Sequence, residues 1–176
     1  MRAIFVAVFI LLGLPLSALT VKPLSFEELV GESAAVVHGR VTDVRSQWTA
    51  DRRGIESLVV VDAIDYLKGS WGGQVIVRVP GGQVGTFVNL IPGAPRFVEG
   101  DRVVLFLKAD GPAVPVITGT SQGVYRVAID QRSGGPMVVP PVTEPGASVT
   151  ARGDLSRRPL SLPAFAEAVR RAGAAR

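Results

Sequence analysis

The chain has 176 residues, a formal net charge of +4, one histidine and no cysteine. The lack of cysteine excludes disulfide bonds, a thiol nucleophile, a lipid-modified N-terminal cysteine and every zinc site that uses cysteine ligands. A single histidine also excludes a histidine-rich metal site.

The first 18 residues predict a signal peptide. Arg2 supplies a positive start, residues 3–16 are almost wholly apolar, and Ser17 and Ala18 are small residues suited to a cleavage point. The apolar stretch is too short to span a bilayer comfortably. We therefore expect residues 1–18 to be removed and the mature protein to be soluble, in the periplasm or outside the cell. About 158 residues remain, which predicts one domain with one ordinary core.

A short helix is predicted next. Ser25 and Glu28 fit a capping box, in which a serine and a glutamate three residues later satisfy the free amides of the first helical turn. The helix should end near Gly31, with a buried stripe formed by Phe26, Leu29 and Val30.

From Ala34 apolar residues recur at every second position, which predicts a strand with one solvent-exposed face. The buried positions are Val37, Gly39 and Val41, so His38 alternates onto the outward face and is expected to be a surface histidine. The apolar phase then moves by one residue, to Val44, Ser46 and Trp48. A β-bulge produces such a phase shift, and it bends a strand so that a small sheet can close on itself.

Further strands are predicted over residues 58–67, 74–79, 102–108 and 123–130, with a short edge piece over 114–118. Bulged strands with few helices predict a mostly β fold, a small five- to six-stranded OB-like barrel that spans residues 19–131. A β-sandwich is the alternative.

The connection over residues 80–97 is rich in glycine and proline, yet it contains six large apolar residues: Val84, Phe87, Val88, Leu90, Ile91 and Phe97. Apolar side chains on a loop above a rigid scaffold predict a contact surface for a partner. The same side chains could instead fill one end of the barrel as a plug. The sequence leaves both interpretations open.

Residues 132–160 are rich in proline, glycine and serine and predict an extended arm, and residues 161–176 predict an amphipathic C-terminal helix. The segment 145–176 carries six arginines against two acidic residues, a net charge of +4, whereas residues 19–144 carry 12 basic and 13 acidic residues, a net charge of −1. The basic C-terminal segment is therefore suited to touching an anionic surface. The slightly acidic body argues against nucleic-acid binding.

No catalytic, cofactor-binding or metal-binding residue is predicted, and the chain is expected not to be an enzyme. Residues 119–123 spell G-x-S-x-G, but a nucleophile elbow needs a helix after Ser121 and a histidine base. A strand-like sequence follows instead, which favours a glycine-framed turn. Residues 81–85 are glycine-rich but lack the Lys-Ser/Thr of a phosphate-binding loop, so positive φ angles are the better explanation.

Three segments together, 35–41, 59–69 and 100–107, look like the netrin-like module, an OB-type barrel found in tissue inhibitors of metalloproteases and in many bacterial exported proteins. The segments 78–82, 92–97 and 122–127 resemble a set of uncharacterised bacterial exported proteins. The likeness covers about residues 25–130. The protease inhibitors chelate the zinc of their target through an N-terminal cysteine, which this chain lacks, so that mechanism does not carry over.

The leading functional hypothesis is a non-enzymatic exported binding module for an unknown protein partner, with residues 80–97 as the contact surface. The resemblance implies an alternative, an accessory or inhibitor-like partner of an exported protease. An unrecognised enzyme is a further alternative, and it would need a polar pocket with convergent titratable groups.

Overall fold

The computed structural model describes residues 23–109, 114–141 and 158–174. The predicted signal peptide over residues 1–18 lies outside the described residues. The chain is mostly strands, with the short helix α1 (Phe26–Glu32) near its start and the helix α2 (Leu162–Ala174) near its end. The predicted mostly β fold with two helices is therefore confirmed.

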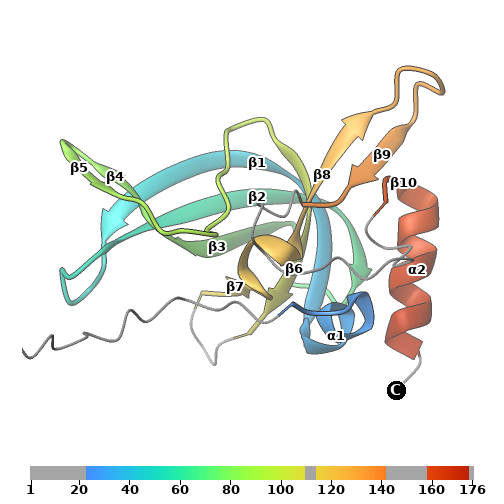
Figure 1. The fold of residues 1–176 in the computed structure, drawn as a ribbon, viewed down its shortest axis with the longest axis horizontal. Helices are drawn as coiled ribbons and strands as arrows, with labels where there is room; N and C mark the ends of the chain where they lie inside the picture. Colours follow the sequence, from blue (N-terminus) through green and yellow to red (C-terminus); the bar gives the residue numbers. More distant parts are fainter. Residues whose placement is uncertain (1–22, 110–113, 142–157, 175–176) are drawn as a thin grey trace, which may run out of the picture.

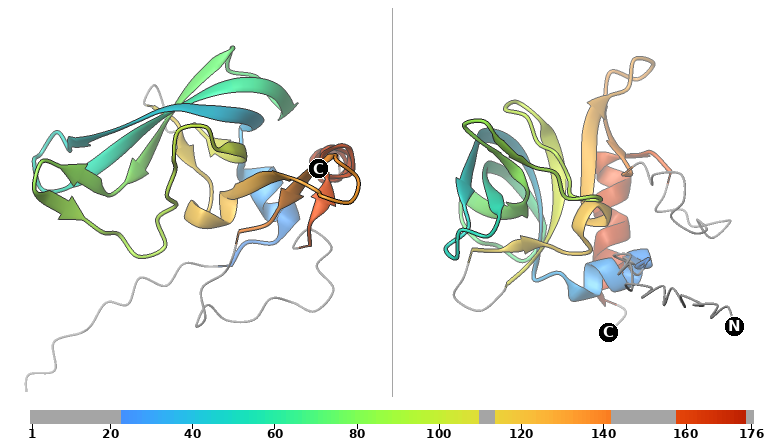
Figure 2. Two further views of the ribbon diagram at one scale, coloured as in Figure 1. Left: turned by 90° about the horizontal axis from the view of Figure 1, so that it is seen from above. Right: turned by 60° about the vertical axis from the view of Figure 1, so that its left-hand side comes forward.

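Five strands close into a ring in the order β1-β2-β3-β7-β6 and back to β1. The two long strands β1 (Ala35–Trp48) and β2 (Ile55–Lys68) pair antiparallel, and the first half of β1 also pairs with β6 (Arg102–Lys108). β3 (Gln74–Pro80) pairs with β2 and meets the short β7 (Val116–Ile117) in parallel. Figure 2 shows the curved sheet turning back on itself.

The bulge predicted in β1 is present. The pairing of β1 with β2 changes register at three points, and one of them lies between Val41 and Asp43. Before this shift Val41 is buried in the ring, and after it Val44 packs against the same group of residues. The extra residue thus keeps the apolar side of β1 turned inward while the strand bends.

The sheet continues past the ring through β8 (Val124–Ile129), β9 (Pro136–Val139) and β10 (Leu160–Ser161). Strand β9 lies within the predicted arm over residues 132–160, so this part of the arm is ordered by pairing with β8. Residues 142–157 of the arm lie outside the described residues.

Two apolar cores lie on the two faces of the sheet. The ring encloses a core made mainly of branched aliphatic residues, including Val37, Val59, Val77, Leu105 and Leu107. The second core lies between the outer face of the sheet and the two helices, and it includes Phe26, Val36, Phe106, Tyr125 and Phe165. Strand β6 is buried on both faces because its alternate residues enter different cores.

The helix α1 is capped as the sequence predicts, and both helices pack an apolar face on the sheet. The Ser25 hydroxyl accepts a hydrogen bond from the Glu28 amide at 3.1 Å, and the Glu28 carboxylate accepts one from the Ser25 amide at 2.8 Å. On α2, Phe165 and Val169 are buried. Within the described ranges, no helix has both the length and the apolar character needed to cross a membrane.

Candidate functional site

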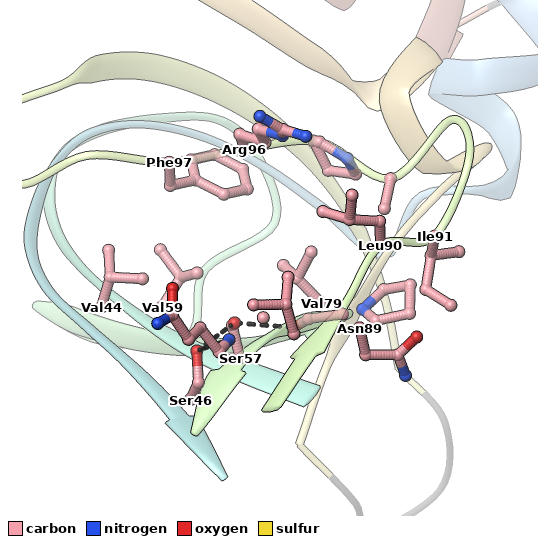
Figure 3. Close-up of a pocket in the computed structure, with 17 residues that line it drawn as sticks. Val44, Ser46, Ser57, Val59, Val79, Asn89, Leu90, Ile91, Arg96 and Phe97 are labelled. Atoms are coloured by element: carbon pink, nitrogen blue, oxygen red, sulfur yellow. Dashed lines mark hydrogen bonds between the residues drawn. The ribbon is translucent and has the colours of Figure 1, made fainter. Parts of the chain in front are cut away.

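A pocket of about 430 Å³ lies at one end of the ring, beneath the segment 80–97 (Figure 3). Its floor is formed by side chains of the first three strands, among them Val44, Val59 and Val79. The two helices lie toward the opposite end of the molecule, as both Figure 1 and Figure 2 show. The pocket is therefore separate from the aromatic core beneath the helices.

The segment 80–97 contains an antiparallel hairpin that the sequence did not predict, formed by β4 (Gly82–Val84) and β5 (Phe87–Asn89). The glycines at its base have positive φ angles, 91° at Gly81 and 144° at Gly82, as expected for this glycine-rich stretch. A Cβ atom on Gly82 would lie 2.4 Å from the Ser46 hydroxyl oxygen and 2.5 Å from that of Ser57. Only glycine allows the hairpin to come so close to β1 and β2.

Two serine hydroxyls hold this hairpin against the ring. Ser57 donates to the Gly81 carbonyl at 2.8 Å, and its oxygen lies 3.0 Å from that of Ser46. Ser46 accepts a hydrogen bond from the Gln83 amide at 3.2 Å. Since the Ser57 proton is engaged by the carbonyl, Ser46 is the donor between the two hydroxyls. Both side chains have structural partners, and neither is arranged as an activated nucleophile.

Arg126 of β8 fixes the other end of the segment. Its guanidinium donates to the Asp101 carboxylate and to the Arg96 carbonyl, and it lies 5.4 Å above the centre of the Phe97 ring. The Asp101 carboxylate also accepts a hydrogen bond from the Val98 amide at 2.9 Å. These contacts hold Phe97 at the mouth of the ring, where it packs against the ring core.

The six apolar residues predicted for this segment divide into two groups. Phe87, Val88 and Leu90 are exposed, by 63%, 56% and 69%. The partly buried ones are Val84, Ile91 and Phe97. Four of the six line the pocket, namely Val88, Leu90, Ile91 and Phe97. The segment therefore partially closes the end of the ring at Phe97 and leaves apolar side chains of the hairpin exposed. On the hairpin, the Phe87 ring packs edge-on against the Trp48 ring, with 5.4 Å between the ring centres.

We expect the two phenylalanines to differ in their contribution to stability. Phe97→Ala should lower the melting temperature by roughly 5–10 °C, because it removes a ring that packs on the core and beneath Arg126. Phe87→Ala should change the free energy of unfolding by less than about 1 kcal/mol, because its ring is mostly in water and its ring contact is with the exposed Trp48. Thermal unfolding followed by circular dichroism measures both. Equal decreases in melting temperature for the two variants would contradict the division of the segment into exposed and partly buried residues.

His38 corrects a prediction, because it is buried, at 2% exposure, rather than on the surface. Its neighbour on β6, Val104, belongs to the second core, so the outward face of β1 is covered at this position. The Nε2 atom of His38 lies 3.4 Å from a guanidinium nitrogen of Arg102. Because arginine can only donate, a hydrogen bond between the two side chains requires Nε2 as the acceptor and therefore a neutral imidazole.

Burial and the positive charge of Arg102 lower the pKa of His38, while Asp65 opposes this shift. The environment thus favours the neutral ring that the hydrogen bond requires. In the described part of the chain, no group of three or more histidine or acidic side chains is placed to hold a metal ion.

The G-x-S-x-G stretch forms a turn. Residues Thr120–Gly123 make a short 3-10 helix after Gly119, whose φ is 64°, and β8 begins directly at Val124. A strand follows Ser121 where a nucleophile elbow needs an α-helix. The predicted glycine-framed turn is therefore confirmed.

Comparison with known proteins gives no match: neither a protein-family model nor a curated protein matches the chain. The likeness to the netrin-like module stays a prediction, and the pocket geometry is the basis for a functional proposal.

Proposed function

We propose that this protein is a non-enzymatic exported binding module that takes an apolar ligand in the pocket beneath residues 80–97. One observation carries the proposal. The ring is incompletely filled at this end, which leaves a pocket of about 430 Å³ whose edge presents Val88 and Leu90 to solvent. Pockets of this volume and apolar character are typical of small-molecule sites.

The chemistry of the lining supports binding rather than catalysis. The residues that line the pocket include no acidic residue and no histidine, and Arg96 is the one ionisable side chain among them. The two serines at the base are engaged in holding the hairpin. A catalytic site needs a nucleophile or a general base within reach of a substrate, and these walls supply neither.

Export and an OB-type origin belong to the same proposal. The N-terminal charge and apolar stretch support export. A five-stranded ring in which β1 pairs with both β2 and β6 supports a relation to small OB-type barrels.

The test uses Nile red, an uncharged apolar dye that fluoresces when it leaves water. We expect the purified protein to bind it saturably, with one dye per chain. Val88→Asp should weaken binding about tenfold or more, because it places a charge on the pocket wall. Ile64→Asp is the matched control, since Ile64 is also an apolar strand residue with 56% exposure, as Val88 is, but it does not line the pocket.

Unchanged dye affinity in Val88→Asp, or an equal loss in both variants, would place the dye elsewhere on the surface. Absence of saturable binding to the parent protein would remove the proposal. The melting temperature of each variant shows whether it is folded.

A further inference from the structure

We propose that the ligand of this pocket is a fatty-acid-type amphiphile, with an apolar body in the pocket and a single carboxylate at Arg96. The inference rests on the proposed function and adds the chemical class of the ligand. It follows from where the charged side chains lie around the pocket and from which polar atoms already have hydrogen-bond partners in the protein.

In the described part of the structure, several charges near this end of the ring are paired, whereas Arg96 on the pocket wall is not. Asp43 pairs with Arg45 at 2.6 Å, and the Asp101 carboxylate pairs with the Arg126 guanidinium. Glu56 lies 3.9 Å from Arg78. Arg96 lines the pocket, and no acidic group of the described ranges lies within 4.0 Å of it. Among the residues that the structure describes, Arg96 is thus a positive charge on the pocket wall without an ion-pair partner.

The backbone that carries Arg96 is held in place. Its carbonyl accepts a hydrogen bond from Arg126, and the next residue, Phe97, lies beneath the same guanidinium. The Arg96 side chain itself is exposed. A guanidinium on a fixed backbone is suited to a carboxylate, because its paired N–H groups match the two carboxylate oxygens.

The floor of the pocket is suited to the apolar part of the ligand. Figure 3 shows Arg96 and Phe97 across the hollow from Val44, Val59, Ser46 and Ser57. The floor is aliphatic, and the two hydroxyls near it already have protein partners. A polar group of the ligand placed there would lose its hydration without gaining a free partner, which is unfavourable. The charged end of the ligand is thus directed to Arg96 and its apolar end to the valines.

The experiment measures displacement of bound Nile red by dodecanoate and by dodecyltrimethylammonium, two amphiphiles with the same chain length and opposite charge. Both are used below their critical micelle concentrations. We expect dodecanoate to displace the dye at about tenfold lower concentration, in line with a charge-assisted hydrogen bond. Arg96→Gln should abolish this preference, so that the two amphiphiles displace the dye at similar concentrations. Arg132→Gln, which alters an exposed arginine in the β8–β9 turn, should keep the preference.

The outcomes separate the two proposals. If Nile red binds but dodecanoate has no advantage, or keeps its advantage in Arg96→Gln, the ligand class is wrong and the binding function stands. If Nile red fails to bind the parent protein, both are wrong. A short apolar peptide with a free C-terminal carboxylate forms a third arm. Tighter displacement by this peptide than by dodecanoate would overturn the assignment to a fatty-acid-type ligand in favour of a protein terminus.

Discussion

Replacement of Phe106 by alanine should lower the free energy of unfolding by about 3–5 kcal/mol. The Phe106 side chain is fully buried, and its ring contacts three other rings of an aromatic group. Its ring centre lies 6.0 Å from that of Phe26, 5.5 Å from that of Tyr125 and 6.2 Å from that of Phe165. The substitution would leave a cavity between the sheet and both helices, and these elements cannot close over it without losing their own contacts.

Equilibrium denaturation in urea measures this loss. Ile129→Ala is the control, because Ile129 is 58% exposed on β8 and its removal should cost less than about 0.5 kcal/mol. A loss below about 1 kcal/mol for Phe106→Ala would contradict the packing of α1 and α2 described above.

The second large effect is expected at Gly39, where β1 and β2 approach closely beside a register shift. A Cβ atom at this position would lie 2.5 Å from a methyl carbon of Val61 and 2.6 Å from the carbonyl oxygen of Asp62. The carbonyl belongs to the strand and cannot rotate away. Gly39→Ala should therefore destabilise the protein by about 1–3 kcal/mol through overpacking.

Gly73→Ala is the matched control for this substitution. A Cβ atom there would meet no atom within 4 Å, and the φ of Gly73 is not positive. Thermal and urea unfolding of Gly73→Ala should resemble those of the parent protein or show a slight gain in stability. Equal stability of the two alanine variants would show that β1 and β2 can separate at the bulge at little cost.

The regular strands could be predicted because the pattern of apolar and polar residues that indicates each one lies within its own sequence. The strand predicted over residues 102–108 matches β6 in full, and the phase shift after Val41 predicted the bulge. Both features depend on the order of apolar and polar residues within one short stretch. The capping box at Ser25 is equally local, and it too is present.

Features that depend on distant parts of the chain could not be predicted in this way. The β4–β5 hairpin has three residues in each strand, too few to show a period, and it is held by Ser46 and Ser57 from other strands. His38 lies on the outward face of β1, as the alternation of the strand predicts, but the second core covers that face. The contacts of Arg126 with Arg96 and Asp101 join residues 30 and 25 positions apart. No pattern within a single stretch reveals such pairings.

The burial of β6 on both faces has a consequence for how the molecule comes apart. Val103, Leu105 and Leu107 belong to the ring core, while Val104 and Phe106 belong to the core beneath the helices. Removing β6 from either core withdraws it from the other, so the two layers cannot melt one after the other. We expect a single cooperative transition in which amide protons of β6 exchange with solvent only when the whole domain unfolds.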